Sequence, residues 1–201
     1  HHRYIAEPDG FARRIVFNQT EAGEGVASLE AYIISKDLLV GMMDACAANS
    51  HYHFHRDAIA EYLAAGGKIN VYLHRGYGKR IMNTEAYFRT GMDMLRPENR
   101  AELFPPERPV RSKSHADVST YYGEDSVCRN SLVADGCVIE GEVENCVLFS
   151  DVRVSRGAKL KNCILMRGCV VGEGVLLNNV IADKEVGISP YQTLLGSAKL
   201  P

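Results

Sequence analysis

The most regular pattern of apolar and polar positions lies between residues 129 and 149, which read RNSLVADGCVIEGEVENCVLF. Single aliphatic residues alternate there with Gly, Asp, Glu and Asn too often for a helix, and no stretch is long enough for an ordinary strand. The pattern therefore predicts very short strands separated by tight turns.

A repeat runs through this part of the chain. Four segments, RNSLV, ENCVL, KNCIL and NNVIA, align on asparagines spaced 15, 17 and 17 residues apart, namely Asn130, Asn145, Asn162 and Asn179. The segments VSRGAKL and VGEGVLL begin 17 residues apart, at Val154 and Val171. Two independent features thus share one period.

This period is too short for helical solenoids or propeller blades, and it divides into three beats of about six residues. It predicts a triangular β-solenoid over residues 123–190, with aliphatic side chains inside and Gly, Asp and Asn at left-handed corners. The beat resembles the hexapeptide-repeat left-handed β-helix. The four asparagines would form a stacked amide ladder at one corner. The alternative is an irregular antiparallel sandwich, in which their register would be accidental.

Residues 3–96 follow a different pattern, in which strands and helices alternate as in an α/β region. Strand-like alternation is found in residues 13–17, 26–35 and 68–74, and helical periodicity in residues 36–49, 54–67 and 84–95. We expect the first helix to start at Ser35 or Lys36, and the second to end at a glycine C-cap. Residues 97–122, rich in proline and charge, are predicted to be a linker arm.

Composition excludes several classes of function. The formal charge of −2, from 23 basic and 25 acidic residues spread along the chain, leaves no basic surface of the kind that binds nucleic acid or anionic membranes. Six cysteines without a CxxC pair indicate reduced thiols in a cytoplasmic protein. No apolar run approaches the ~20 residues of a membrane span.

The start of the chain, His1 and His2, is interpreted as the remnant of a purification tag. The sequence RYIAEPDGFARRIVFNQ that follows reads as the middle of a domain. We therefore expect the chain to be a fragment of a longer protein.

Three histidines in HYHFHRD, His51, His53 and His55, form the most ligand-like cluster, because alternate residues of a strand project to one side. No cysteine or further histidine is placed by sequence to complete a site, so no metal site is predicted. GxGxxG, P-loop and GxSxG motifs do not occur. Nothing in this chain by itself assembles an active site, and no catalytic residue is predicted.

Other charged residues are weaker candidates. Carboxylates at Asp57, Glu61 and Glu85 fall in predicted helices, where a solvated face is their commoner fate. Basic residues of the linker and the solenoid could form an anion site or simply a solvated face; they are Arg108, Arg111, Lys113, Arg153, Arg156, Lys159 and Lys161. Arg156 is the first candidate among them.

Taken in order, these segments resemble the C-terminal part of the glucose-1-phosphate adenylyltransferases, also called ADP-glucose pyrophosphorylases. VASLEAYIISKDLL is similar to the family's Ser-Met-Gly-x-Tyr-x-Phe strand, FHRDAIAEYL to its Phe-Gly-Lys-Asp-x-Ile-Pro segment, and YGKRIMNTEAYFRTGMDML to its Tyr-Trp-x-Asp-Val-Gly-Thr segment. RPVRSK resembles the start of the arm that precedes the β-helix. The similarity covers nearly all of residues 3–186.

The resemblance implies the end of a Rossmann-like nucleotidyltransferase domain followed by a left-handed β-helix. Active members convert ATP and glucose 1-phosphate into ADP-glucose and pyrophosphate with Mg²⁺, at the start of bacterial glycogen synthesis. The β-helix contributes to oligomer assembly, and effectors bind near its junction with the catalytic domain. Arg156 falls near a family effector-binding arginine.

Several positions depart from the family's substrate contacts. Gln19 and Thr20 replace the Glu and Lys of Phe-Val-Glu-Lys-Pro, whose lysine grips the sugar phosphate. Glu30 replaces the glycine of Ser-Met-Gly, although Ser28 is retained, and Arg80 replaces an aspartate that helps to hold Mg²⁺. Arginine cannot ligate Mg²⁺, and threonine cannot replace a phosphate-binding ammonium. These five positions are therefore interpreted as a vestigial substrate site.

The departures resemble those of a degenerate second subunit that supports or regulates a catalytic one. The family's Gly-rich nucleotide-binding half is missing, so this fragment should be inactive and should need no cofactor. Expected partners are a catalytic subunit, further copies through the β-helix and a small anionic effector. The alternatives are an active adenylyltransferase with rearranged contacts and a hexapeptide-repeat acyltransferase, although no histidine follows His115 to serve the latter.

Overall fold

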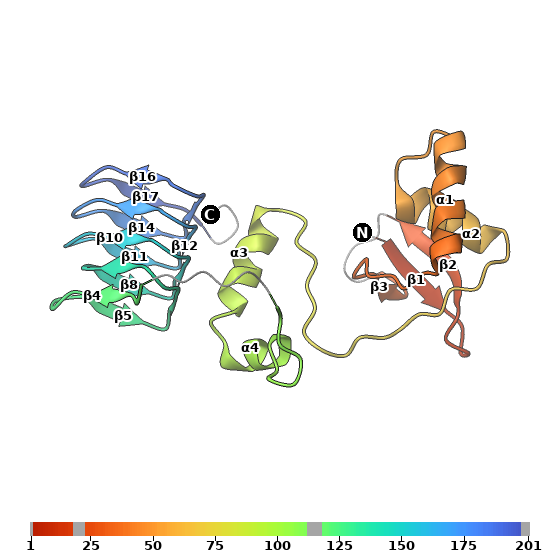
Figure 1. Ribbon diagram of the computed structural model, residues 1–201, viewed down its shortest axis with the longest axis horizontal. Helices are drawn as coiled ribbons and strands as arrows, with labels where there is room; N and C mark the ends of the chain where they lie inside the picture. The colour runs from red at the N-terminus through yellow and green to blue at the C-terminus, as the bar shows by residue number, and fades with distance from the viewer. Residues whose placement is uncertain (1, 18–22, 112–117, 198–201) are drawn as a thin grey trace. The chain divides into compact units, whose positions relative to one another are not determined.

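The computed structural model describes residues 2–17, 23–111 and 118–197. The chain divides into two compact units, His1–Gly78 and Lys79–Pro201. An α/β region is followed by a parallel β-solenoid, so the predicted fold class is confirmed (Figure 1). Among the described residues, no helix has the length and apolar character needed to cross a membrane.

The first unit contains a three-stranded antiparallel sheet in the order β2-β1-β3. Its strands are β1 (His2–Ala6), β2 (Ala12–Phe17) and β3 (Val26–Ala27). The β1–β2 turn contains Gly10, whose φ of 85° suits a residue without a Cβ and whose N–H donates to the Glu7 carbonyl at 2.9 Å. His2 is the first residue of β1 and is buried, although the sequence assigned it to a tag remnant.

The helices of the first unit are α1 (Lys36–Ala48), η1 (Phe54–Ile59), which is a π-helix, and α2 (Ala60–Ala64). They pack against the sheet around a core that includes Tyr4, Met42 and Ile59. Ser35 is the N-cap residue of α1, as predicted. Gly66, with a φ of 86°, follows α2, and the N–H of the next glycine donates to the Tyr62 carbonyl at 2.8 Å, so the predicted glycine C-cap is also found.

Two predicted strands of this unit are largely absent from the described structure. Only Val26–Ala27 of residues 26–35 pairs as a strand, and residues 68–74 contribute a single bridge between Asn70 and Phe11. The apolar alternation is nevertheless used, because Ile34 and Val71 pack against the core from extended backbone. Alternation reports burial of every second side chain, and it does not require a ladder partner.

The second unit begins with α3 (Thr84–Asp93) and α4 (Pro97–Leu103). Asn83 caps α3 by accepting a hydrogen bond from the Ala86 N–H at 2.7 Å. The helix α4 occupies the start of the predicted linker 97–122, so that prediction differs from the structure there. Pro97 stands in the first turn of α4, where its missing N–H is harmless, and a proline at such a position starts a helix.

The rest of the second unit is a solenoid whose strands stack in parallel on three faces (Figure 1). The first face contains β4 (Tyr121–Tyr122), β7 (Val138–Ile139), β10 (Arg153–Val154), β13 (Val170–Val171) and β16 (Gly187–Ile188). The second contains β5 (Val127–Arg129), β8 (Glu142–Glu144), β11 (Lys159–Lys161), β14 (Leu176–Asn178) and β17 (Thr193–Leu195). The third contains β6 (Leu132–Val133), β9 (Val147–Leu148), β12 (Ile164–Leu165) and β15 (Ile181–Ala182).

The strand register reproduces the sequence repeat. Ile164 pairs with Val147 on one side and with Ile181 on the other, each 17 residues away. Inward residues such as Leu165 and Val171 are fully buried and form one continuous core. The strands run from 121 to 195 and so extend slightly beyond the predicted 123–190.

One corner of the solenoid is two residues shorter than its neighbours. Only residues 140 and 141 connect β7 to β8, whereas residues 155–158 connect β10 to β11. This accounts for the single spacing of 15. Gly141 closes the short corner so tightly that a Cβ there would lie 2.5 Å from the Ala158 carbonyl oxygen and 2.8 Å from that of Ser155.

The four repeat asparagines share a left-handed backbone, with φ between 42° and 53°. This is the corner conformation expected of them, since asparagine tolerates it better than most residues. Their predicted amide ladder forms in part. Asn130 donates to Asn145 at 2.7 Å, whereas Asn162 donates to Asn178 at 3.3 Å and Asn179 to the Gly196 carbonyl at 3.2 Å.

All six cysteines are free thiols, and all but Cys128 are buried. Cys163 lies in the solenoid core, where its Sγ donates to the Lys161 carbonyl at 3.1 Å. Cys169 does the same to the Asp183 carbonyl at 2.9 Å, and burial raises the pKa of this thiol. The core cysteines therefore act as small apolar residues, as predicted.

Candidate functional site

Two of the predicted vestigial residues, Ser28 and Glu30, lie close together just after β3. The Ser28 Oγ accepts a hydrogen bond from the Glu30 N–H at 3.0 Å, and Ser28 is buried. Glu30 has a φ of 59°, a conformation that glycine, its counterpart in the resembled family, adopts without strain. The turn has therefore kept its shape while gaining a carboxylate.

The Glu30 carboxylate is adjacent to two imidazoles. Its Oε1 lies 3.5 Å from the His2 Nδ1 and 3.9 Å from the His55 Nδ1. The two histidine rings are stacked, with centroids 4.5 Å apart and planes 9° apart. We call His2, Glu30 and His55 the histidine–glutamate cluster. Imidazole and carboxylate are the side chains that most readily share protons and divalent cations.

Tyrosines hold the buried side of this cluster. The His2 Nε2 lies 3.1 Å from the Tyr32 hydroxyl, which accepts a hydrogen bond from the Tyr4 hydroxyl at 3.3 Å. Burial, followed by the hydrogen bond to Tyr32, raises the pKa of Tyr4, so this residue stays protonated and remains the donor. The His2 ring is thus fixed on one side by a hydroxyl chain, while its Nδ1 faces Glu30.

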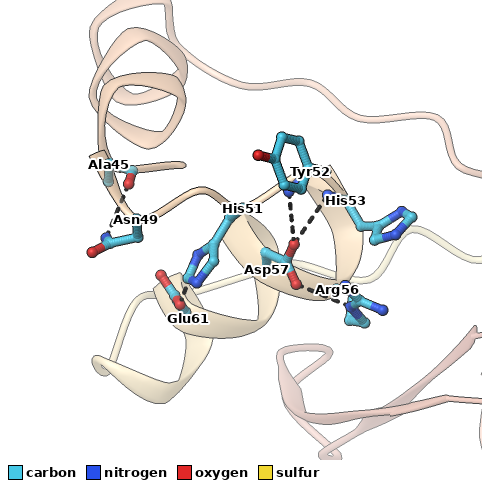
Figure 2. Close-up of polar contacts among 8 residues, drawn as sticks. All are labelled: Ala45, Asn49, His51, Tyr52, His53, Arg56, Asp57 and Glu61. Atoms are coloured by element: carbon cyan, nitrogen blue, oxygen red, sulfur yellow. Dashed lines mark hydrogen bonds and ion pairs between the residues drawn. The ribbon is translucent and has the colours of Figure 1, made fainter. Parts of the chain in front are cut away.

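The loop before η1 is closed by Asp57 (Figure 2). Its Oδ2 accepts hydrogen bonds from the N–H groups of Tyr52 and His53 at 3.1 and 3.0 Å, and its Oδ1 accepts one from the Arg56 Nε at 3.0 Å. These backbone bonds, together with the Arg56 guanidinium, lower the pKa of Asp57 to about 2. Asp57 is therefore a structural carboxylate that sets the path of the chain into η1, which carries His55.

Stability should depend on this carboxylate in a defined pH window. The pKa of Asp57 falls from 3.8 to about 2 on folding, so its contribution is present above 3.8 and is lost as the pH falls towards 2. The variant Asp57→Asn should be less stable than the wild type near neutral pH and closer to it at about pH 3. Urea unfolding at both pH values measures this, with Asp44→Asn on the exposed side of α1 as the control. Parallel curves for wild type and Asp57→Asn would contradict the assignment.

The three histidines of HYHFH do not converge. His51 Nδ1 lies 3.2 Å from Glu61 Oε1, a charge contact without hydrogen-bond alignment. His53 is held through its backbone N–H, and His55 alone joins the cluster. Glu85 forms an ion pair with Arg89 at 2.7 Å on the surface of α3. None of these carboxylates is placed for acid or base chemistry.

The remaining predicted substrate positions are not gathered around Ser28 and Glu30 in the described structure. Gln19 and Thr20 lie outside the described residues. Arg80 belongs to the second unit, whereas Ser28 and Glu30 belong to the first. The five vestigial positions therefore remain a prediction as a set.

The basic residues of the solenoid are spread over different faces. Lys159 and Lys161 pair with Glu142 and Glu144 on the second face, at 2.8 and 3.1 Å. Arg153 stands on the first face, and Lys113 lies outside the described residues. These residues therefore do not share one anion site.

Arg156, the first candidate for effector binding, lies in the corner between β10 and β11. Its side chain is 83% exposed, and its Nε lies 3.7 Å from the Glu140 Oε1. Such a contact leaves the guanidinium accessible to solvent and to a small anion. A role for Arg156 in binding an effector remains a prediction.

Sequence reasoning missed His2 as a site residue. Its assignment to a tag removed it from the search for ligands, and Glu30 was considered only as a lost glycine. The alternation of buried His2 and Tyr4 with less buried neighbours is the signal of a half-buried strand that could have revealed it.

Comparisons with known proteins support the resemblance. A sequence profile described as "GlmU-like, C-terminal hexapeptide" matches residues 115–198. The chain is 41% identical over 186 residues to the glycogen biosynthesis protein GlgD of Bacillus subtilis, which covers 90% of this chain and 52% of that protein. It is 30% identical over 142 residues to a glucose-1-phosphate adenylyltransferase of Clostridium perfringens, which covers 71% of this chain and 36% of that enzyme.

A glucose-1-phosphate adenylyltransferase of Bacillus cytotoxicus is 32% identical over 137 residues, or 67% of this chain and 36% of the enzyme. The chain thus spans about half the length of the first relative and just over a third of the two enzymes. Because similarity extends through both units for the first relative, the order of segments seen in the sequence is confirmed.

Proposed function

Because this chain is a relative of GlgD and of the glucose-1-phosphate adenylyltransferases, we propose that it is part of a non-catalytic, regulatory subunit of such an enzyme in glycogen biosynthesis. The complete enzyme would form ADP-glucose and pyrophosphate from ATP and glucose 1-phosphate. The subunit would act on the rate or the effector response of a catalytic partner.

The observation that carries this proposal is the difference between the two groups of relatives. Identity to the glycogen biosynthesis protein GlgD is 41% and extends over 90% of the chain. Identity to the two adenylyltransferases is 30% and 32%, over 71% and 67% of the chain. The chain therefore shares more, over a longer stretch, with the relative that is not named as an adenylyltransferase.

Charge at Glu30 supports the same proposal. A glycine at this turn would present only backbone, whereas Glu30 adds a carboxylate that is 36% exposed. An anionic group beside a sugar-phosphate site opposes binding of the phosphate. Loss of a lysine at Thr20 and of a Mg²⁺ ligand at Arg80 would act in the same direction, because phosphoryl chemistry depends on cationic groups that stabilise charge.

The proposed partners are a catalytic subunit and further copies of this chain. The parallel solenoid ends in strands with one unpaired edge, which oligomer contacts commonly cover. A small anionic effector bound near Arg156 is part of the proposal. Mg²⁺ would be held by the catalytic partner and not by this chain.

The test is ADP-glucose formation from ATP and glucose 1-phosphate with Mg²⁺. The full-length protein is assayed alone, and then mixed with the catalytic subunit from the same organism, with the catalytic subunit alone as the reference. We expect no turnover above background by the full-length protein alone. In the mixture we expect a rate or an effector response that differs from the reference.

Two results would overturn the proposal. Robust turnover by the full-length protein alone would establish an active adenylyltransferase with rearranged substrate contacts. A mixture that behaves as the catalytic subunit alone, together with no co-elution of the two proteins, would exclude a regulatory subunit of this enzyme.

A further inference from the structure

The histidine–glutamate cluster brings three metal-ligating side chains together from three separate elements. His2 comes from β1, Glu30 from the turn after β3 and His55 from η1, and one ligand atom of each lies within 4.8 Å of the other two. The sheet order places β1 beside β3, so the first two ligands are neighbours because of the strand pairing. All three belong to the first unit.

The distances within the cluster suit a shared cation better than direct hydrogen bonds. The two contacts from imidazole Nδ1 to Glu30 Oε1 are 3.5 and 3.9 Å, whereas hydrogen bonds of this kind are roughly 2.7–3.2 Å long. Zinc bonds of about 2.0–2.1 Å in a tetrahedron place neighbouring ligand atoms roughly 3.3 Å apart. A small inward movement would therefore close the three groups around one ion.

The surroundings of His2 are those of a metal ligand. The Nε2 of a histidine bound through Nδ1 needs a polar partner that fixes the ring, and the Tyr32 hydroxyl lies 3.1 Å from it. His2 is buried, whereas the His55 side chain is 36% exposed and has room to move. Because the stacked rings are nearly parallel, His55 is the residue that must turn to direct its lone pair at the ion.

We propose that His2, Glu30 and His55 bind one divalent transition-metal ion of the zinc type through two Nδ1 atoms and a carboxylate oxygen. Two imidazoles and one carboxylate are a ligand set that zinc accepts, and the remaining tetrahedral position takes a water molecule or an anionic ligand. This proposal is independent of the regulatory role, since it rests on the geometry of the first unit alone.

The test is metal binding by the full-length protein, purified without a histidine tag. Zn²⁺ affinity is measured by competition with a chromophoric chelator, and Co²⁺ is used as a probe of tetrahedral coordination through its visible absorption. We expect one ion per chain. His55→Ala and Glu30→Gln should each lower the affinity on the order of 100-fold, and Tyr32→Phe about tenfold. His53→Ala, from the same histidine-rich segment but outside the cluster, should bind as the wild type does.

Circular dichroism shows whether each variant is folded, and Zn²⁺ should raise the melting temperature of the wild type but not that of Glu30→Gln. The proposal is wrong if the wild type shows no saturable one-to-one binding. It is also wrong if His55→Ala and Glu30→Gln, both folded, bind as tightly as the wild type. Loss of binding in His53→Ala would place the ion on the exposed histidine-rich segment and would overturn the site.

Discussion

Replacing Gly141 by alanine is expected to lower the free energy of unfolding of the solenoid by about 3 kcal/mol. The added Cβ would meet the Ala158 and Ser155 carbonyl oxygens at 2.5 and 2.8 Å. Both oxygens are fixed, because the first accepts from the Glu142 N–H at 2.8 Å and the second from the Ala158 N–H at 3.2 Å. The clash can be relieved only by moving the backbone of two coils.

The measurement is urea unfolding followed by circular dichroism. Gly187→Ala is the matched control, because Gly187 lies in β16 of the same solenoid and a Cβ there meets nothing within 4 Å. We expect the control to unfold close to the wild type. Equal midpoints for Gly141→Ala and Gly187→Ala would show that the short corner is not tightly packed.

Replacing Leu165 by alanine should cost about 3–5 kcal/mol, which is the upper range for a leucine in a rigid core. Leu165 is fully buried in β12 and lies between Leu148 and Ala182 of the neighbouring coils. Ladder bonds on both sides hold these coils at their spacing, with the Leu165 carbonyl accepting from the Phe149 N–H at 2.9 Å. The walls therefore cannot collapse into the cavity that the truncation leaves.

Leu176→Ala is the control for this variant, since Leu176 is 41% exposed on the second face. The same unfolding experiment should show a loss below about 1 kcal/mol there. If the two leucine variants lose equal stability, the assignment of inward and outward positions is wrong.

The solenoid could be predicted from sequence because its information is local and repeated. Each of the four asparagines marks a left-handed corner, and each inward residue such as Leu165 recurs one coil away in Ala182. A short period therefore specifies the fold before any long-range contact is known. The one irregular spacing of 15 also anticipated the short corner at Gly141.

The first unit was less predictable because its contacts join distant segments. The strand β1 pairs with β2 and β3, and its His2 meets Glu30 and His55 from far along the chain. Periodicity carries no information about such meetings. Pro97 misled in another way, since one residue type marks both linkers and the first turn of a helix, and only the residues that follow decide between them.

The short corner has a further consequence for how the chain finds its register. Successive coils are so alike that strands displaced by one whole coil would still bury aliphatic residues against one another. The two-residue connection at Gly141 breaks this equivalence, because a coil with a four-residue connection cannot make the same close approach. A displaced chain would carry the mismatch wherever it stopped. The missing pair of residues thus serves as an index mark that makes one alignment of the coils distinguishable from all others.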